Sequence, residues 1–500
     1  MPKLSRRKVI AGSAVAVGIG GFAGLAIVGP RIGTWVTDSS VESTEHETPL
    51  LIPDLYEGEI VDGVRQFSLT MQEGETEFVP DQTTPTWGVN ADYLGPTLRA
   101  SRGDTVQVEV QNDLPEGSVL HWHGMHLPAE MDGGPHQITA PGDSWLPVWD
   151  ITQPASTLWY HPHPHGNTAD HVWKGLAGLF IIDDDEEASV PDDYGVDDVP
   201  LVIQDRGFND DGEFDTRDWA FGYFGDHILV NGTWGAKFDV TRRLTRFRIL
   251  NGSNTRWYNL MFDDERPFRL IATDAGYVGE DPPEMTSLLL SPAERAEIVV
   301  EFEPGDDVML RSVEANHWQL EDYGADIDFD IIRFVATEEL AESDEIVLPE
   351  FESSVGQPAE DNRRRYTLNG HSSINDKEMD MSRIDDVIPA GAEEIWEVHS
   401  SNFASHNFHI HGVSFEVLEF DGKEPPVHQR GPKDTVQIPK DQTVTLRVKF
   451  PDYTDETYPY MYHCHILRHE DQGMMGQFLV VEPGREDAVP REFESAHAHH

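Results

Sequence analysis

The chain of 500 residues has 91 Asp and Glu against 36 Lys and Arg, a formal net charge of -55, which excludes nucleic acid and anionic membrane surfaces as partners because both would repel the protein. Hydrophobic residues make up 38% and aromatic residues 10% of the chain, which excludes a disordered protein and allows about two to three domain cores. The acidic residues are spread along the sequence and concentrated salt would screen their repulsion, so we expect a halophile, specifically a halophilic archaeon, as the source.

The first expected element is an export signal over residues 1–30. Arg6 and Arg7 precede an apolar, glycine-rich run without charges from residue 9 to residue 28, the pattern of a twin-arginine signal. The run approaches the roughly 20 residues that a membrane span needs, so an uncleaved anchor is the alternative, and it is the one route by which we expect membrane contact. We therefore expect a secreted or cell-surface protein, with a polar linker over residues 31–49.

The rest of the chain has the pattern of an all-β protein. Residues 105–110, 246–250 and 443–448 alternate polar and apolar side chains or are rich in branched ones, and turn signals separate such runs. A strand and turn, followed by a strand that ends in or near Asn, recurs three times, which predicts three similar sandwiches. We expect domain 1 over residues 50–190, domain 2 over 196–350, domain 3 over 360–484 and a tail over 485–500.

Four segments each place two histidines two residues apart. Alternate residues of a strand point to the same face, so each segment offers half of a metal site. Two pairs fall in domain 1 and two in domain 3, and we expect one site where these domains meet, with a metal-free domain 2 that positions them. Eight imidazoles would serve about three ions with open positions, and imidazole suits copper, zinc, iron or nickel. The paired histidines are His121, His123, His161, His163, His409, His411, His463 and His465.

The single cysteine decides between these metals. Cys464 lies between His463 and His465, so strand alternation directs its sulfur to the face opposite their rings. One thiolate, two imidazoles and a thioether make the blue electron-transfer copper site with a weak axial Met, and zinc would not need the Met. The sequence therefore predicts a copper site behind the histidine cluster, built from the nearby His406, His469 and Met474 together with Cys464.

These segments resemble the four copper-binding signatures of the multicopper oxidases, the family of laccases, bilirubin oxidases and bacterial cuprous oxidases. The resemblance spans roughly residues 50 to 484 and rests on His-Trp-His-Gly at 121, Trp-Tyr-His-Pro-His at 159, His-Asn-Phe-His-Ile-His-Gly at 406 and the run from His463 to Met474. It implies three cupredoxin-like Greek-key β-sandwich domains. Asn407 stands where many relatives have Pro, a difference that we expect to affect local stiffness rather than ligation.

The resemblance also implies four coppers per chain. The type 2 copper would bind His121 and His409. The type 3 pair would bind the other six paired histidines, which are His123, His161, His163, His411, His463 and His465. The type 1 copper would bind His406, Cys464, His469 and Met474. Single electrons would arrive from the substrate at the type 1 copper and pass through Cys464 to the histidine cluster, where four of them would reduce dioxygen to water.

Two acids are expected to supply protons beside the cluster. Asp132 resembles the family acid that serves the cluster, and the alternative is turn chemistry, since Asp-Gly is a common turn dipeptide. Glu470 resembles a second family acid on a water path, and the alternative is support of the neighbouring ligand. Asn231 and Asn251 each begin an N-glycosylation acceptor pattern, with turn chemistry as the alternative.

The reducing substrate is expected to be a phenol or an aromatic amine, as in laccases. A cuprous oxidase that serves copper tolerance is the runner-up, and a bilirubin oxidase is a further alternative. The Met-rich insertion of cuprous specialists is missing from the sequence, and Met379 and Met381 are more simply core or turn residues. A copper nitrite reductase would not need four histidine pairs, and a non-enzymatic cupredoxin scaffold should have lost ligands.

The remaining histidines are expected to be dispensable for ligation. His126, His136 and His165 lie near the first two signatures, but each ligand set is complete without them. His497, His499 and His500 belong to the C-terminal tail.

Overall fold

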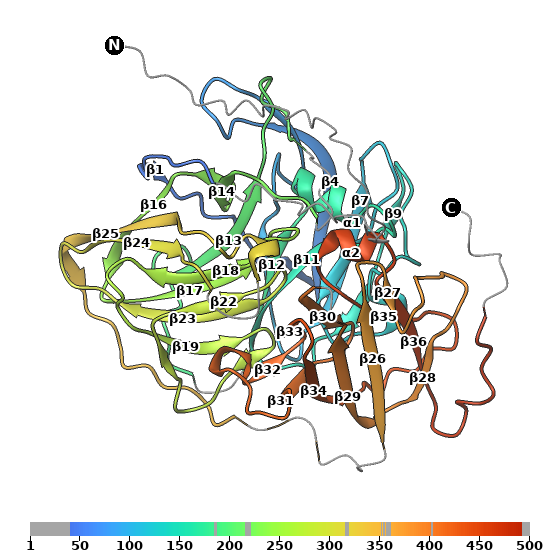
Figure 1. Cartoon of the computed structure of the whole chain (residues 1–500). Helices are drawn as coiled ribbons and strands as arrows, with labels where there is room; N and C mark the ends of the chain where they lie inside the picture. The colour runs from blue at the N-terminus through green and yellow to red at the C-terminus, as the bar shows by residue number, and fades with distance from the viewer. Residues whose placement is uncertain are drawn as a thin grey trace, which may run out of the picture. The chain divides into compact units, whose positions relative to one another are not determined.

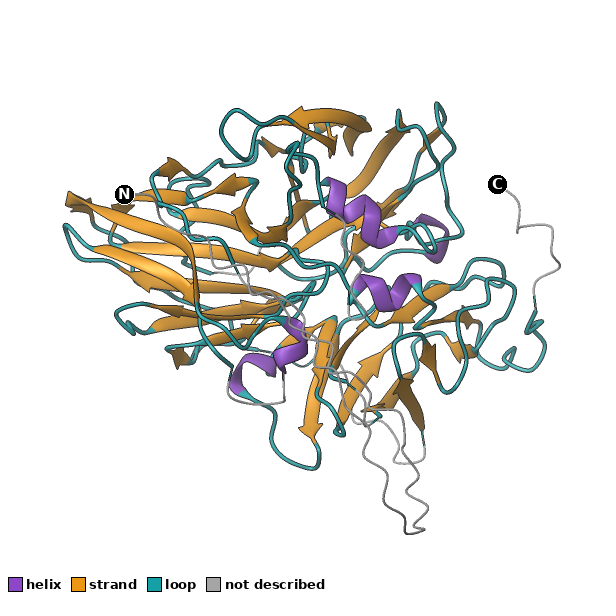
Figure 2. Ribbon diagram, turned by 45° about the horizontal axis from the view of Figure 1, so that its top comes forward, coloured by secondary structure: helices purple, strands orange, loops and turns teal. Residues whose placement is uncertain are grey.

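Figure 1 shows the computed structural model of the chain. It describes residues 41–184, 188–215, 222–315, 320–351, 353, 356, 362–401 and 404–492. The expected export signal, residues 31–40 of the expected linker and the C-terminal histidines lie outside the described residues. Within the described part, no helix has both the length and the apolar character that crossing a membrane requires. Strands dominate the chain and the helices are few and short (Figure 2).

Six sheets pack in pairs as three cupredoxin-like Greek-key β-sandwiches, confirming the all-β prediction. In the first sandwich, one sheet has the order β10-β7-β4-β3 with β5 and β9 at its sides, and the other has the order β2-β6-β12-β11-β8. Its elements are β2 (Leu55–Tyr56), β3 (Glu59–Val61), β4 (Val64–Thr76), β5 (Thr84–Val89), β6 (Thr97–Ser101), β7 (Thr105–Asn112), β8 (Leu120–His123), η1 (Ala129–Met131), β9 (Ser144–Trp145), β10 (Val148–Asp150), β11 (Ser156–Pro162), α1 (Thr168–Lys174) and β12 (Gly178–Asp183).

The second sandwich pairs a sheet of order β1-β16-β25-β24-β18-β22 with one of order β15-β14-β13-β17-β23-β19-β20, in which β21 also pairs with β19. Its elements are β1 (Thr48–Pro49), β13 (Asp198–Arg206), β14 (His227–Val230), β15 (Thr233–Trp234), β16 (Ala236–Arg242), β17 (Leu244–Asn251), β18 (Tyr258–Phe262), β19 (Phe268–Thr273), β20 (Gly276–Tyr277), β21 (Glu284–Met285), β22 (Leu288–Leu290), β23 (Arg295–Glu301), β24 (Asp307–Ser312), η2 (Leu320–Tyr323) and β25 (Phe329–Ala341).

The third sandwich pairs a sheet of order β27-β26-β29-β34-β31-β32 with one of order β28-β36-β35-β30-β33. Its elements are β26 (Arg363–Asn369), β27 (Ser373–Ile374), β28 (Asp386–Pro389), β29 (Glu393–Ser400), β30 (His406–Ile410), β31 (Phe415–Phe420), η3 (Val427–Gln429), β32 (Pro432–Lys433), β33 (Thr435–Ile438), β34 (Thr443–Lys449), β35 (Tyr460–His463), α2 (Leu467–Asp471) and β36 (Met475–Val481).

Side-chain alternation builds the first and third cores as the sequence predicts. On β7, Val106, Val108 and Val110 are buried in the first core while the residues between them are partly or fully exposed. Strand β34 repeats the pattern in the third core. Each buried valine stabilises the fold by about 1.5–3 kcal/mol relative to an exposed one.

Strand β17 is an exception, because it is buried on both faces. Phe247 and Ile249 enter the second core, while Arg246 and Arg248 point to the other side and pair with Glu297 and Asp198. This group of four buried charges contacts the first sandwich, since Thr157 of β11 donates a hydrogen bond of 2.6 Å to Glu297.

The expected linker over residues 31–49 is wrong at its C-terminal end. Thr48 and Pro49 form β1, which pairs in parallel with Ala236 and Lys237 of β16. Val41, Leu50 and Ile52 pack against the second core. The chain therefore contacts the second sandwich before it enters the first, because apolar residues in this segment find a sheet edge that is distant in sequence.

Asn231 and Asn251 are structural residues in the fold. Asn231 is 5% exposed and donates from its amide to Leu51 O and Pro200 O, at 2.8 and 2.9 Å. Asn251 is fully buried, and its amide donates to two main-chain carbonyls. Since both amide nitrogens are buried and hydrogen-bonded, the folded chain offers neither to a glycan, and turn chemistry explains the pattern.

Candidate metal centre

The paired histidines lie on the outer faces of one sheet in the first sandwich and one in the third. On β8, Leu120 and Trp122 pack into the first core, so strand alternation points His121 and His123 away from it. The same alternation operates around His161, His409 and His463, because their neighbours Tyr160, Ile410 and Cys464 enter the first or third core. The sequence spacing thus becomes two rows of imidazoles, each backed by a hydrophobic core.

Strand register brings these rows together. His121 lies opposite His161 in the antiparallel pairing of β8 with β11, and His409 lies opposite His463 in the pairing of β30 with β35. The rows of the two sandwiches meet, because ring nitrogens of His163 and His463 approach to 3.3 Å across 300 residues of sequence. The histidines of the first and third sandwiches therefore form one cluster, as the sequence predicts.

One trio of ring nitrogens joins His123, His161 and His465. His123 Nδ1 lies 3.3 Å from His161 Nε2, which lies 3.4 Å from His465 Nε2. The Trp159 ring stacks on His161, with centroids 4.2 Å apart, and also contacts the other two rings. The indole therefore covers one side of this trio.

A second trio joins His163, His411 and His463. His411 Nε2 lies 3.1 Å from His463 Nε2. Behind the trio, the Glu470 carboxylate lies 3.5 Å from His163 Nδ1 and 3.2 Å from His463 Nδ1. Burial raises the pKa of Glu470, but the two histidines outweigh burial, so that the pKa falls below its ordinary range.

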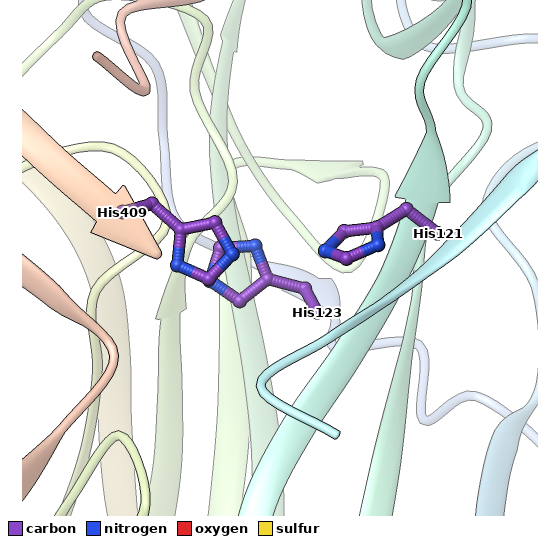
Figure 3. Close-up of side chains that lie close together, drawn as sticks. All are labelled: His121, His123 and His409. Carbon is purple, nitrogen blue, oxygen red and sulfur yellow. The ribbon is translucent and has the colours of Figure 1, made fainter. Parts of the chain in front are cut away.

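His121 and His409 complete the cluster between the trios. The rings of His123 and His409 stack, with centroids 3.7 Å apart and planes at 12° (Figure 3). One ring nitrogen from each of His121, His123 and His409 lies within 4.8 Å of the others. His121 Nδ1 contacts the Asp132 carbonyl at 2.9 Å and His409 Nδ1 contacts the Asp434 carbonyl at 2.8 Å, which leaves both Nε2 atoms facing the cluster.

These nitrogens fit metal ions. The Nε2 atoms of His121 and His409 are buried and have no hydrogen-bond partner among the described residues, an expensive state for a polar atom. Burial lowers the pKa of His121, His161 and His409 well below the usual range, so their rings are neutral near pH 7, the form that binds metal. Metal cations bound between these ring nitrogens would accept their lone pairs and so give each buried nitrogen a partner.

The Cys464 site lies inside the third core. Cys464 Sγ lies 3.7 Å from His406 Nδ1 and 3.6 Å from His469 Nδ1, and all three side chains are fully buried. Met474 is also buried, and its main-chain N–H donates a hydrogen bond of 2.9 Å to the carbonyl of His469. Burial raises the pKa of the Cys464 thiol to about 12, so a thiolate here requires a bound cation, and the donor set of one sulfur and two imidazoles suits copper.

Asn407 does more than change local stiffness. Its Oδ1 accepts a hydrogen bond of 2.7 Å from the His465 main-chain N–H, and its Nδ2 donates to Pro292 O at 2.8 Å. The expectation that Asn407 affects stiffness alone is therefore incomplete. A Pro at this position could not link the His465 segment to the second sandwich.

Asp132 is a buried cluster residue as well as a turn residue. It is 1% exposed, and its Oδ2 lies 2.7 Å from His411 Nδ1 while its carbonyl contacts His121. Burial raises its pKa well above the ordinary range. It follows η1 and precedes Gly133, whose φ of +78° fits glycine and where a Cβ would lie 2.0 Å from Leu120 O.

The other histidines near the signatures belong to none of the ligand groups found in the described part of the chain. His136 Nε2 lies 2.8 Å from Gln477 Oε1 and links the Asp132 loop to β36. Burial lowers the pKa of His126 to about 4. Burial also lowers the pKa of His165.

Sequence reasoning missed Asp434 and Arg295. Asp434 Oδ1 lies 3.1 Å from His123 Nε2 and pairs with Arg295, and both side chains are at most 1% exposed. Arg295 comes from the second sandwich, which the sequence predicts to position the site without indicating a residue that does so. No sequence pattern marks either residue. The structure places the backbone of Gly124 against them, since Gly124 has φ +84° and a Cβ there would lie 2.4 Å from Asp434 Oδ2.

Comparison with known proteins agrees with this geometry. Multicopper oxidase family models match residues 70–187 and 351–484. A multicopper oxidase, mco, from Staphylococcus epidermidis is 34% identical over 450 residues, which cover 88% of this chain and 94% of that protein. The cell division protein FtsP of Xenorhabdus nematophila is also 34% identical over 450 residues, covering 87% of this chain and 93% of that protein.

A solved structure supports the same relationship. The bacterial laccase-like multi-copper oxidase CueO from Ochrobactrum sp. matches with a TM-score of 0.78 and 36% identity, covering 87% of this chain and 100% of that one. The chain belongs to the multicopper oxidase family, copper-dependent oxidoreductases that use dioxygen as electron acceptor.

Proposed function

We propose that the protein is a laccase-like oxidase, which takes single electrons from phenols or aromatic amines and reduces dioxygen to water with four of them. The observation that carries the proposal is the position of Cys464. Its sulfur faces His406 and His469, while its neighbours His463 and His465 join two different histidine trios. Cys464 is bonded through the backbone to both His463 and His465. The backbone therefore connects the proposed electron-accepting copper site directly to the histidine cluster.

We assign four coppers to these groups. Bound copper supplies one-electron transfer at the Cys464 site and dioxygen reduction at the histidine cluster. The type 1 ligands are His406, Cys464, His469 and Met474. The type 2 ligands are His121 and His409. The type 3 ligands are the two trios, His123, His161 and His465 with His163, His411 and His463.

The carboxylates of Asp132 and Glu470 lie beside the histidine cluster, where dioxygen reduction consumes protons. Asp132 contacts His411 at 2.7 Å from outside the cluster, and Glu470 contacts His163 and His463, the other two histidines of the same trio. Both acids are almost fully buried, and each contacts a histidine of the cluster. We propose that Asp132 and Glu470 pass protons to the reduced oxygen.

Laccase-like substrates are supported by the named activities of the relatives. The Ochrobactrum protein has oxidase activity towards lignin model compounds and lignosulfonate. A laccase from Pediococcus acidilactici is 33% identical, with a TM-score of 0.80 and coverage of 89% of this chain and 95% of that one.

Cuprous ion is the second candidate substrate. The Met379 N–H donates a hydrogen bond of 2.9 Å to Gly473 O, immediately before the proposed ligand Met474. Met379 and Met381 are partly exposed, and thioether sulfur is a soft ligand for cuprous copper. This loop would let a metal ion deliver its electron near the type 1 site.

Oxygen consumption in concentrated salt tests the function. The copper-loaded protein is given a phenol, an aromatic amine or cuprous ion, with a Cys464→Ser variant as the control that lacks the type 1 sulfur. We expect consumption with the aromatic donors and none with the variant. Consumption with cuprous ion alone favours the second candidate, and no consumption with any donor overturns both.

We also propose that residues 1–30 export the protein by the twin-arginine route to the medium or the cell surface. The paired Arg6 and Arg7 before an uncharged run support this. Replacing both with Lys should keep the protein inside the cell, as fractionation would measure. Continued export of the double variant would exclude this route.

A further inference from the structure

Arg295 extends from the second sandwich to the histidine cluster. It begins β23, is 1% exposed and forms two parallel hydrogen bonds with the Asp434 carboxylate, one of them 2.8 Å from Nη1 to Oδ1. Its remaining N–H groups donate to the carbonyls of Thr157, Ala293 and Asp274 at 2.9 to 3.0 Å. All five guanidinium donors are therefore used, which leaves the group one orientation.

Asp434 transmits this orientation to two proposed ligands. Its Oδ1 lies 3.1 Å from His123 Nε2, and its main-chain carbonyl lies 2.8 Å from His409 Nδ1. A carboxylate only accepts hydrogen bonds, so it places the ring proton of His123 on Nε2 and leaves the Nδ1 lone pair facing His161. His123 thus presents Nδ1 to the cluster, whereas His161 and His465 present Nε2.

Close packing prevents the pair from relaxing. A Cβ at Gly124 would lie 2.4 Å from Asp434 Oδ2 and 3.0 Å from Arg295 Nη2. On the other side, Thr435 Oγ1 lies 3.1 Å from His123 Nε2 and donates 3.0 Å to Asp434 Oδ1. The Asp434 carboxylate is held from three directions.

The pair is part of a larger buried charge network. Lys433 Nζ lies 2.9 Å from Asp274 and 3.1 Å from Glu294, and each of these side chains is at most 1% exposed. Buried ion networks stabilise proteins little, because desolvation offsets the attraction, and apolar replacements are often as stable. Stability alone therefore does not account for this network beside the cluster.

We propose that Arg295 is a positioning residue, which acts through Asp434 to fix the ring of His123 and the carbonyl contact of His409. The metal-free second sandwich thereby holds one wall of the dioxygen-reducing centre. The inference rests on the proposed ligand set.

Copper retention by the full-length, copper-loaded protein tests the proposal. The variants are Arg295→Lys and Asp434→Asn. Asp434→Asn is nearly isosteric, so it still tests the proposal if the buried lysine of Arg295→Lys prevents folding. The matched control is Arg256→Lys, because Arg256 pairs with Asp205 at 3.1 Å in the same sandwich and both are fully buried. The readouts are copper per chain after dialysis against a chelator, the blue type 1 absorption, the type 2 electron paramagnetic resonance signal and the melting temperature.

We expect both test variants to hold copper at the histidine cluster about 10- to 100-fold more weakly, as is usual when the partner of a metal-bound histidine is lost, while the blue absorption remains. The control should melt earlier and keep its type 2 signal. Full copper retention in Asp434→Asn, or parallel loss of type 1 and type 2 copper, overturns the proposal. A further outcome is that the wild type retains copper and yet oxidises no phenol. If the variants then lose copper from the histidine cluster alone, the positioning role is supported and only the laccase-like function is rejected.

Discussion

His371 stacks on His469, with ring centroids 4.7 Å apart and planes at 7°. His469 is fully buried, and its ring is a proposed type 1 ligand. His371 is only partly buried, so an organic donor that approaches His469 from this side meets the His371 ring first. The loop beyond it also packs on the ligand segment, since Met379 N–H donates to Gly473 O.

We predict that His371→Ala admits larger donors. Loss of the ring pair should lower the free energy of unfolding by about 0.5–1.5 kcal/mol, and the opened surface should raise kcat/KM for a bulky phenol more than for a small one. Steady-state kinetics with two phenols of different size would measure this, with the blue absorption as the control for an intact copper site. An equal change for both phenols would contradict a covering role.

We predict that Asp132→Asn slows dioxygen reduction by about 10²- to 10⁴-fold, the usual contribution of a positioned proton donor or acceptor. The amide keeps the size of the carboxylate beside His411 but cannot give up a proton at neutral pH. Stopped-flow reoxidation of the reduced enzyme measures the step, and the blue absorption should be unchanged because Asp132 does not contact the Cys464 group. Unchanged reoxidation would remove Asp132 from proton transfer.

The grouping of the proposed ligand residues could be predicted because their signal is local. His121 and His123 are two residues apart on one strand, and a period of two is a property of the strand itself. The same reasoning places Cys464 on the face opposite His463 and His465, and the Cys464 group and the two trios in the structure have this arrangement. The fold class follows from the same alternation on strands such as β7.

Other features could not be predicted, because they arise from packing between segments that are distant in sequence. Arg295 and Asp434 are 139 residues apart and neither stands in a distinctive pattern. Thr48 and Pro49 become a strand only because the edge of β16 is beside them. The burial of Asn231 likewise depends on Leu51, which lies 180 residues away.

We predict that acid destabilises the second sandwich through Asp198 and Glu297. Burial raises the pKa of each acid, but Arg248 and Arg246 outweigh it, so both pKa values fall below the ordinary values of 3.8 and 4.5. A lowered pKa in the folded state means that the ion pairs stabilise the fold above those ordinary values and lose this effect as pH falls through the folded values. Melting curves between pH 7 and pH 2 would follow the loss.

Glu297→Gln is the variant that isolates this contribution. It leaves Arg246 and Arg248 to share the single negative charge of Asp198, so one buried positive charge is uncompensated and the free energy of unfolding at pH 7 should fall by about 3–5 kcal/mol. The difference between variant and wild type should shrink in acid. Glu301→Gln is the control, because Glu301 pairs with Arg243 at an exposed position, where an ion pair contributes at most about 1 kcal/mol. A constant difference at every pH would contradict the ion-pair explanation.

We predict that salt stabilises the folded chain. The net charge of -55 repels itself over a screening length of about 10 Å at 0.1 M salt, and this length falls to about 3 Å at 1 M. The folded state concentrates the charge more than the unfolded state does, so screening favours folding. The melting temperature should rise by at least about 2 °C between these concentrations, which corresponds to roughly 2 kcal/mol for a chain of this size. Sucrose at equal osmolality is the control, because it strengthens burial without screening charge. If sucrose reproduces the whole increase, charge repulsion is not what salt relieves.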